Sequence, residues 1–419
     1  MRNLLPLLLS CAAPLSATIV GRVVPPESLS VTRVERSPVA DRAAWLAYLR
    51  RSEAAMRADK AALAAERRPG QPIPPPPREA TNGSGLALDR ETAWYASAEA
   101  KAVADTVVSF QTPAGGWGKN LDRTVPPRLP GQSWTGGDSK AGGRAAQDGA
   151  AGWSFVGTLD NDATVAELRF LARVQTHAPD PRYRAAFARG VAYLLQAQYP
   201  DGGWPQVYPL QGGYHDALTL NDDTMVRAVA LLRDVAAGAG DFAFVPATTR
   251  QAAGEAVERA LRVLLAAQVV VDGRRTIWAQ QYDPLTLRPV AARNFEPAAL
   301  ATGESAGVLR LLMAQPNPSP AMHAAIEAGV AWFRDHPVRE SEWAKTADGR
   351  RLVAKPGAPL LWARFHDPAT GKPIFGDRDR AVHDDVNALS RERRDGYSWF
   401  NTSGNSLLAA YDKWKRRQG

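Results

Sequence analysis

From about residue 86 onward, apolar residues recur at the spacing of amphipathic helices. Stretches rich in Ala, Leu and Val alternate with loops rich in Gly, Pro, Asp and Trp, and convincing strands with alternating apolar and polar residues are scarce. The pattern therefore predicts an all-α fold. The expected helices are Arg90–Phe110, Asp162–Thr176, Pro181–Gln198, Asp222–Ala237, Thr248–Gln268, Pro297–Leu312, Pro320–Asp335 and Gly404–Lys415.

A repeat in the loops indicates how these helices are arranged. Gln111–Trp117 and Gln198–Trp204 share the pattern Gln-x-x-x-Gly-Gly-Trp, and each follows a long predicted helix. Degenerate copies follow at Gln268–Trp278 and near Leu361–Trp362, so a unit of roughly 80 residues recurs, enough for two helices and their loops. Such hairpins stacked around an axis form an (α/α) toroid, an incomplete barrel whose long loops line a cleft. We expect the motif tryptophans to pack between hairpins, with ligand stacking as the alternative.

The N-terminal 85 residues differ from the rest of the chain. Residues 1–17 have the layout of a secretory signal, with an early arginine, a short apolar run and then small residues. That run is too short to span a bilayer, which takes about 20 apolar residues. We therefore expect a secreted, periplasmic or cell-surface protein. Residues 18–85 are interpreted as a helical arm from Asp41 to Arg67 followed by a proline-rich linker, and residues 86–419 as the main domain.

The only cysteine, Cys11, lies in the sequence Leu8-Leu9-Ser10-Cys11, which loosely resembles a bacterial lipoprotein box. Lipid attachment there would tether the protein to a membrane. The alternative is ordinary cleavage between Ser10 and Ala17, which discards the cysteine. A single cysteine excludes a disulfide framework and a four-thiolate zinc site, because both need several sulfurs from one chain. Nothing later in the chain predicts a membrane span.

Composition and charge narrow the classes of partner. The chain of 419 residues is 45% hydrophobic and 22% charged, which excludes disordered, collagen-like and multi-span membrane proteins. The formal net charge of +8 favours a polyanion such as nucleic acid, anionic lipid or an acidic polysaccharide. The basic residues are spread through loops and interleaved with acids, so we do not expect nucleic-acid binding. We expect a monomer.

Two near-copies, Thr158–Thr164 and Thr219–Thr224, place Asp and Asn residues at the start of predicted helices. Helix capping is one interpretation, because a carboxylate there accepts backbone N–H groups and complements the helix dipole. A cap needs one such residue, whereas each cluster supplies three, and crowded carboxylates repel each other unless a cation is present. Since hard oxygen ligands suit Ca²⁺, we expect a shared calcium site.

Arginines gather in the loops of the C-terminal half. Arg364 and Arg378 flank the loop Asp367–Pro373, with Phe365 and Phe375 beside them. A planar guanidinium suits bidentate recognition of a carboxylate, although a solvated surface is the alternative. Together with the export signal, the oxygen-rich clusters and the 12 tryptophans, these arginines fit an acidic polysaccharide.

These segments together resemble the pectate lyases of polysaccharide lyase family 10. The resemblance spans roughly residues 90 to 415, and the ordered set of motifs is far more specific than one Gly-Gly-Trp. The matching motifs are Gly115–Asn120, Leu159–Thr164, Gly202–Gln206, Leu220–Met225, Trp278–Asp283, Arg293–Pro297, Trp362–Phe365, Phe375–Arg378 and Arg394–Trp399. The resemblance implies an (α/α) toroid, secretion, and Ca²⁺-assisted cleavage of polygalacturonate (pectate) to 4,5-unsaturated oligogalacturonides.

The resemblance also implies roles for individual residues in an anti β-elimination. Arg293 would be the Brønsted base and Asp160 a second catalytic residue. The implied substrate-binding residues are Arg364, Arg378, Asn161, Lys119, Asn120 and Asn294, and the implied calcium ligands are Asp160, Asp222 and Asp223. Because the pKa of arginine exceeds 12 in water, the base role requires nearby cations and a desolvated site that favour the neutral form.

Two other functions compete with this interpretation. A terpene-cyclase-like α/α barrel shares Gln-x-x-x-Gly-x-Trp repeats, but Leu220 stands where its acidic motif needs Asp, and the arginine loops replace an aromatic cavity. A non-catalytic surface protein that captures pectic fragments would use the arginines and calcium without a base. One departure from the family is the long Gly/Pro/Ser-rich segment Leu121–Gly152, whose role the sequence leaves open.

Overall fold

The computed structural model describes residues 18–80, 85–136, 153 and 155–418. The expected signal segment, residues 1–17 with Cys11, lies outside the described residues, and so do residues 137–152 of the long segment Leu121–Gly152. Within the described residues, no helix has both the length and the apolar character needed to cross a bilayer.

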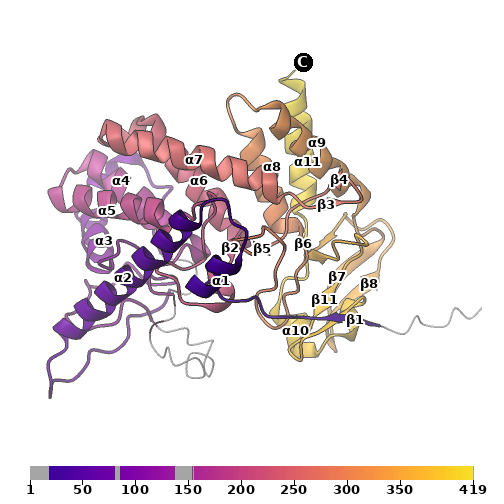
Figure 1. The fold of residues 1–419 in the computed structure, drawn as a ribbon, viewed down its shortest axis with the longest axis horizontal. Helices are drawn as coiled ribbons and strands as arrows, with labels where there is room; N and C mark the ends of the chain where they lie inside the picture. The colour runs from indigo at the N-terminus through magenta and orange to yellow at the C-terminus, as the bar shows by residue number, and fades with distance from the viewer. Residues whose placement is uncertain (1–17, 81–84, 137–152, 154, 419) are drawn as a thin grey trace, which may run out of the picture.

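Long helices dominate the main domain and gather in the upper part of Figure 1. Their bounds are α3 Ala98–Ser109, α4 Val165–His177, α5 Pro181–Ala197, α6 Thr224–Ala237, α7 Ala247–Ala267, α8 Thr302–Met313, α9 Pro320–Asp335 and α11 Ser403–Arg416. Consecutive helices α4–α5, α6–α7 and α8–α9 contact each other as hairpins, and α11 packs against α8 and α9. The predicted all-α toroid is confirmed.

The helix ends differ from the prediction where loop contacts intervene. The stretch expected as Arg90–Phe110 divides into a 3₁₀ turn, Thr92–Ala96, and α3. The helix expected from Pro297 begins only at Thr302, because Leu300–Ala301 (β6) first pairs with Phe365–His366 (β10). Pairing with the distant strand β10 therefore keeps Leu300 and Ala301 out of a helix, although their local sequence allows one.

Short antiparallel strands, which the sequence analysis did not predict, join the loops. β11 (Phe375–Gly376) and β12 (Ala381–His383) form a three-stranded sheet with β1 (Ile19–Arg22). The two-stranded pairs are β2 Leu218–Thr219 with β5 Gln281–Tyr282, β3 Val270–Val271 with β4 Arg274–Arg275, β6 with β10, β7 Ser341–Thr346 with β8 Gly349–Ala354, and β9 Trp362–Ala363 with β13 Phe400–Asn401. A strand of two or three residues is too short to show alternation, and β1 is exposed along its whole length. The six-residue strands of the β7–β8 hairpin were therefore the ones that the sequence could have predicted.

The motif tryptophans are fully buried and cap the outer helices α3, α5, α7 and α9, which confirms their predicted packing role. Each indole N–H donates to a carbonyl in the last turn of the preceding helix, one of the acceptors that a helix end leaves unpaired. The bonds are Trp117 to Val107 at 2.7 Å, Trp204 to Leu194 at 2.8 Å, Trp278 to Leu264 at 2.7 Å and Trp362 to Phe333 at 3.0 Å. The repeat thus builds the same helix end four times.

The motif glutamines join each outer helix to the next one. The Gln198 amide donates to Gly202 O and to Ala256 O of α7, both at 2.9 Å, while its carbonyl accepts from Arg259 at 2.8 Å. Gln111 and Gln268 make the equivalent bonds to α5 and α9. The turn also needs its first glycine: Gly202 has φ +108°, and a Cβ there would lie 2.4 Å from Arg259 O.

The N-termini of the inner helices converge on one region of loops. Helices α4 and α6 begin just after the two acidic clusters, α8 begins after β6, and α11 begins after β13. Neighbouring inner helices contact each other in the order α4, α6, α8 and α11. At the last junction, the Asn401 amide donates to Thr302 Oγ1 at 2.8 Å. Every inner helix therefore directs the positive end of its dipole toward the same loops.

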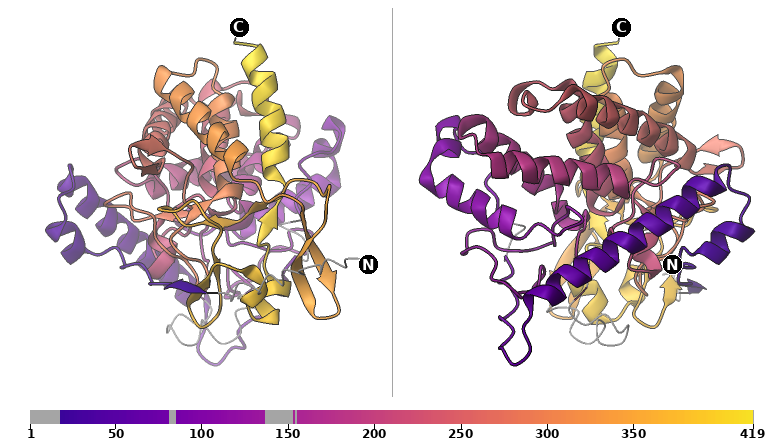
Figure 2. Two further views of the ribbon diagram at one scale, coloured as in Figure 1. Left: turned by 90° about the vertical axis from the view of Figure 1, so that its right-hand side faces the viewer. Right: turned by 60° about the vertical axis from the view of Figure 1, so that its left-hand side comes forward.

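The N-terminal segment lies along the main domain. It comprises β1, α1 (Val31–Arg36) and the long α2 (Arg42–Glu66), which crosses the hairpins in the right-hand view of Figure 2. Trp45 and Tyr48 of α2 pack on Tyr199, with ring centroids 5.3 and 4.9 Å away. The Tyr48 hydroxyl donates to Ala197 O at 3.1 Å, at the C-terminal end of α5.

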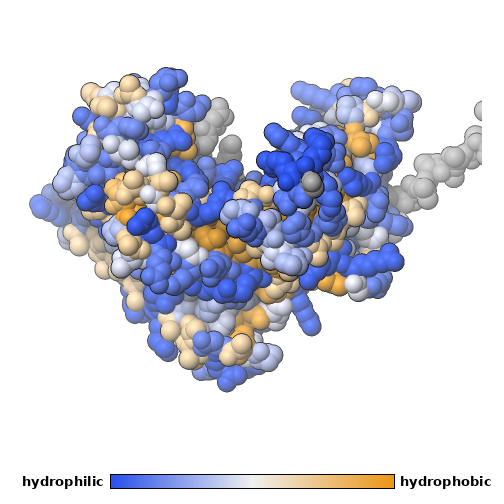
Figure 3. Space-filling view, turned by 90° about the horizontal axis from the view of Figure 1, so that it is seen from above, coloured by the Kyte–Doolittle hydropathy of each residue, from blue (hydrophilic) through white to orange (hydrophobic). Residues whose placement is uncertain are grey.

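Seen from above, the molecule is notched between the mass on the left and the mass on the right that carries the end of α11, and apolar residues line part of the hollow (Figure 3). The end of α11 is strongly hydrophilic, with Lys413, Lys415 and Arg416 in its last turn.

Gln198→Ala is expected to lower the free energy of unfolding by about 1–3 kcal/mol, because two carbonyls and Arg259 lose their buried partner. Urea unfolding measures the change, and the exposed Gln196→Ala on the same helix is the matched control. Equal stability of the two variants would show that the Gln198 hydrogen bonds do not stabilise the fold.

Asp59 of α2 is fully buried, and burial raises its pKa from 3.8 to about 7, although its bond from Ala114 N–H opposes the rise. The folded state therefore holds a proton that the unfolded state releases, and stability falls as pH rises from about 4 to 7. Asp59→Asn is expected to be more stable than the wild type by an amount that grows over this range and stays constant above it. A difference independent of pH in thermal or urea unfolding would contradict this.

Candidate active site

The two acidic clusters form tight turns before helices α4 and α6. Asn161 has φ 51° and Asp222 has φ 52°, a left-handed conformation that Asn and Asp adopt more readily than most residues. Neither helix has a side-chain hydrogen bond at its N-cap residue. The capping interpretation therefore does not account for these acids, and the turn geometry instead projects them into the loop region.

Asp160 is buried at the centre of a set of polar contacts. Its Oδ2 accepts from Lys119 Nζ at 2.7 Å, and its Oδ1 accepts from the Gln206 amide at 2.9 Å and from Asn221 at 3.5 Å. Nearby, the Asn161 amide donates to Asn120 Oδ1 at 3.1 Å. The structure thus brings together the predicted residues of the first cluster and of the Gly-Gly-Trp-Gly-Lys-Asn motif.

Asp222 lies beside Asp160 and opposite two arginines. Burial and the negative charge of Asp160 raise the pKa of Asp222 above its usual value, while Arg364, Asn221 and Arg293 act in the opposite direction. Its Oδ2 accepts from the neutral Asn221 amide at 3.0 Å. Two carboxylates held this close repel each other unless a cation reaches them.

Asp223 does not join this pair. Its carboxylate lies against α8, where a Cβ on Gly307 would meet Asp223 Oδ1 at 2.1 Å. Arg227 and Arg310 are the cations that stabilise its charge. The structure therefore assembles Asp160 and Asp222, and it directs the third predicted calcium ligand toward a helix.

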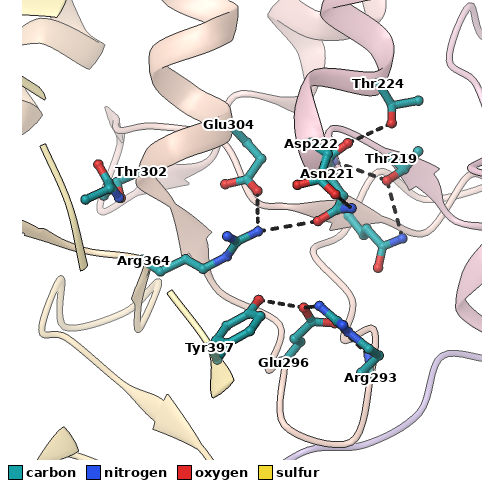
Figure 4. A network of polar contacts seen from close by, with 12 residues as sticks. Thr219, Asn221, Asp222, Thr224, Arg293, Glu296, Thr302, Glu304, Arg364 and Tyr397 are labelled. Atoms are coloured by element: carbon teal, nitrogen blue, oxygen red, sulfur yellow. Dashed lines mark hydrogen bonds and ion pairs between the residues drawn. The ribbon is translucent and has the colours of Figure 1, made fainter. Parts of the chain in front are cut away.

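Arg364 links the second acidic cluster to α8. Its Nη2 donates to Glu304 Oε1 at 2.8 Å and to Asn221 Oδ1 at 3.4 Å, as Figure 4 shows. Burial raises the pKa of Glu304, although the charge of Arg364 opposes this effect, and Glu304 Oε2 has no hydrogen-bond partner among the described residues. Arg364 is thus oriented by α8 beside Asp222.

Arg293 is held by a buried carboxylate. Its Nε donates to Glu296 Oε2 at 2.8 Å and its Nη2 to Glu296 Oε1 at 2.5 Å, and the Tyr397 hydroxyl donates to the same Oε1 at 2.6 Å (Figure 4). Burial opposes ionisation of both partners, but their mutual attraction lowers the pKa of Glu296 to about 2 and raises that of Arg293. In this state Arg293 is a cation, the opposite of what a base requires.

Two guanidinium groups share the ring of Tyr397. Arg293 Cζ lies 5.5 Å and Arg364 Cζ 5.1 Å from its centroid. Arg378 belongs to the same region: its Cζ lies 4.8 Å from the Phe295 ring, as does that of Arg293, and its carbonyl accepts from the Asn294 amide at 2.6 Å. The predicted arginines therefore form one basic side of the site, facing the acidic pair.

Aromatic rings continue the acidic side. Lys119 Nζ lies 3.4 Å from the centroid of Phe155, whose edge meets His215 at 5.1 Å, and His215 lies against Tyr214 at 4.1 Å. All three rings are partly exposed. A partly exposed ring near a lysine suits a ligand that has both an apolar face and a negative charge.

A buried ion pair supports the loop that carries Lys119. Arg123 and Glu167 are fully buried and bond at 2.9 Å, and Arg123 also donates to Gly118 O at 3.3 Å. Because Glu167 belongs to the first turn of α4, the pair fixes this loop to the helix that follows Asp160.

Sequence reasoning did not assign Gln206, Asn221, Glu296, Glu304 or Tyr397 to the site. Four of them lie in the quoted motifs, and Glu296 is only three residues from its partner Arg293. The contacts of Asn221 with Arg364 and of Tyr397 with Glu296, however, join loops far apart in the chain. Glu304 carried no signal, because a single glutamate in the first turn of a helix is common. Among the described residues, no group of three or more His, Cys, Asp or Glu is arranged to hold a metal ion.

Comparison with known proteins identifies the family. The family model described as pectic acid lyase matches residues 111–408. A mutant of the family 10 polysaccharide lyase from Cellvibrio cellulosa in complex with trigalacturonic acid is 32% identical, with a TM-score of 0.65, over 78% of this chain and 98% of that chain. The family 10 polysaccharide lyase from the same organism is 31% identical, with a TM-score of 0.66, over 79% of this chain and 97% of that chain. A search of curated proteins gives no match. The expected resemblance is confirmed: the chain belongs to the pectic acid lyase family and is a polysaccharide lyase.

Proposed function

We propose that this lyase cleaves polygalacturonate by a Ca²⁺-assisted anti β-elimination outside the cytoplasm. The observation that carries the proposal is a site with an acidic pair on one side and three arginines on the other. Such a site matches a substrate that carries one carboxylate per sugar. The relative in complex with trigalacturonic acid supports the same substrate class.

The chemistry of the donor set fits calcium. Asp160, Asp222 and the side-chain oxygen of Asn221 are hard oxygen ligands, and burial together with the charge of Asp160 raises the pKa of Asp222, which a cation would oppose. These three residues would hold the ion, with uronate carboxylates and water completing its shell. A bound calcium ion would stabilise the negative charge that builds on the substrate carboxylate during the reaction.

The arginines would perform the remaining steps. Arg364 and Arg378 would bind uronate carboxylates, and Lys119 would bind a neighbouring sugar. Arg293 would take the C5 proton. The C5–H electron pair would then form the C4–C5 double bond as the C4–O4 bond breaks, and the departing O4 would take a proton from water. The Glu296 contact must loosen for Arg293 to accept a proton, and the positive charge of nearby Arg364 favours that neutral form.

Secretion rests on residues 1–17, which have the layout of an export signal. Lipid attachment at Cys11 would keep the same protein at the cell surface. In both cases the enzyme would meet polymeric pectate, which is too large to enter a cell.

Absorbance at about 235 nm, where an unsaturated uronate absorbs, tests the reaction on polygalacturonate at alkaline pH with calcium and then with a chelator. We expect a rise that the chelator abolishes. Arg293→Ala is expected to lower kcat by a factor of about 10²–10⁴, whereas the exposed Arg288→Ala nearby leaves it unchanged. A flat trace from folded wild-type protein would refute the elimination, and an Arg293→Ala enzyme with normal turnover would refute the base.

Asp222→Asn tests the cation site through stability as well as activity. Without calcium, the variant is expected to have a higher free energy of unfolding than the wild type, because it removes a charge that partial burial and the neighbouring Asp160 destabilise. Calcium should raise the melting temperature of the wild type but not of the variant, and lyase activity should be lost. The exposed Asp272→Asn is the control. A calcium-induced shift that persists in Asp222→Asn would place the ion elsewhere.

A non-catalytic capture protein is the second candidate, because the bidentate Glu296 contact holds Arg293 as a cation. The assay separates the two functions: a capture protein binds oligogalacturonides without forming the 235 nm product.

A further inference from the structure

The N-terminal segment 18–66, which we call the strap, lies outside the family match that begins at residue 111. Its elements contact four separate loops of the main domain, which belong to both sides of the site. The strap therefore gives the site loops contacts that the family motifs do not supply.

The β1 end of the strap completes the sheet next to Arg378. β1 pairs with β12, Val23 N–H donates to Arg380 O at 2.8 Å, and Arg22 donates to Asp379 O at 3.1 Å. Without β1, Arg378 would lie at the tip of a lone hairpin of β11 and β12. A two-stranded hairpin is marginally stable by itself, whereas a third strand on an apolar core holds it, and Val23 is buried in that core.

The middle of the strap holds the loop that leads to Arg293. Arg33 of α1 forms a buried ion pair with Asp283, which follows β5. The other oxygen of Asp283 accepts from Leu285 N–H at 2.9 Å and from Thr286 N–H at 3.0 Å, so it shapes the turn after that strand. This turn begins the connection to Arg293.

The α2 end of the strap holds loops of the acidic side. Ser52 Oγ accepts from Leu210 N–H at 2.9 Å, in the loop between Gln206 and His215. Asp59 accepts from Ala114 N–H at 2.8 Å, just before the motif that carries Lys119. One continuous segment thus ties the basic side of the site to its acidic side.

We propose that the strap is a positioning element for polyuronate binding, in which β1 holds the Arg378 hairpin at a fixed distance from the acidic side. The proposal rests on the proposed function, because it treats Arg378 as a carboxylate-binding residue. Arg378 Nη2 lies 3.1 Å from Glu392 and its side chain is half-exposed, so the backbone under it, and not its ion pair, is the stronger restraint. β1 would therefore act on substrate affinity more than on turnover.

Val23→Pro removes the N–H that bonds Arg380 O, and Val24→Pro, at an exposed neighbour, is the matched control. Arg22→Ala, which keeps Val23 in the core, is a second variant. We expect KM for polygalacturonate to rise five- to twentyfold in Val23→Pro and twofold or more in Arg22→Ala, with kcat within twofold of the wild type and Val24→Pro unchanged.

The outcomes distinguish this inference from the proposed function. If wild-type protein forms no 235 nm product, the proposed function fails, and calorimetric binding of trigalacturonic acid to the same variants tests the strap directly. If the wild type is active but Val23→Pro and Val24→Pro have equal KM and equal affinity, the strap inference is overturned. A fall in kcat and melting temperature without a change in KM or affinity would overturn it as well, because that result marks a purely structural role.

Discussion

The backbone carbonyls of the first three motif tryptophans, Trp117, Trp204 and Trp278, each tie a site loop to a helix end that the same residue caps. While the indole N–H caps the outer helix, the carbonyl accepts an N–H from the residues just before an inner helix. These bonds are Trp117 to Thr158 at 2.9 Å, Trp204 to Thr219 at 3.0 Å and Trp278 to Ala301 at 2.8 Å. Asp160, Asp222 and Glu304 follow those partners by two or three residues, so the repeat that builds the toroid also places the site.

Charge balance is the second constraint on this site. Lys119 pairs with Asp160, Arg364 with Glu304 and Arg293 with Glu296, whereas Asp222 accepts from a neutral amide. Because paired charges in a partly buried site keep their neighbours ionised, the molecule is prepared to meet a chain of carboxylates with cations already in place. A hard cation beside Asp222 would offset its repulsion with Asp160 and would also attract the carboxylates of a polyanionic substrate.

The helices and the family could be predicted from sequence because both depend on local signals. The helical spacing of apolar residues can be recognised within a short window of the chain. The Gln-x-x-x-Gly-Gly-Trp motif likewise indicates a helix end, a left-handed glycine and a buried ring within seven residues. The predicted helix ends were wrong where a distant segment pairs with the same residues. Leu300–Ala301, for example, pairs with β10 instead of extending α8. For the same reason the strap contacts could not be predicted, since a strand such as β1 is defined by its partner about 360 residues away.

For the site, the sequence by itself determined which residue types gather near which helix ends: Asp160 and Asp222 before α4 and α6, and Arg293, Arg364 and Arg378 in loops. Only the tertiary structure decided their relations. It turned Asp223 toward Gly307, placed Glu304 beside Arg364, and brought the Tyr397 hydroxyl to Glu296. The physical reason is that the direction of a side chain depends on backbone angles, and its pKa on charges from distant loops. A short stretch of sequence determines neither the direction nor the pKa.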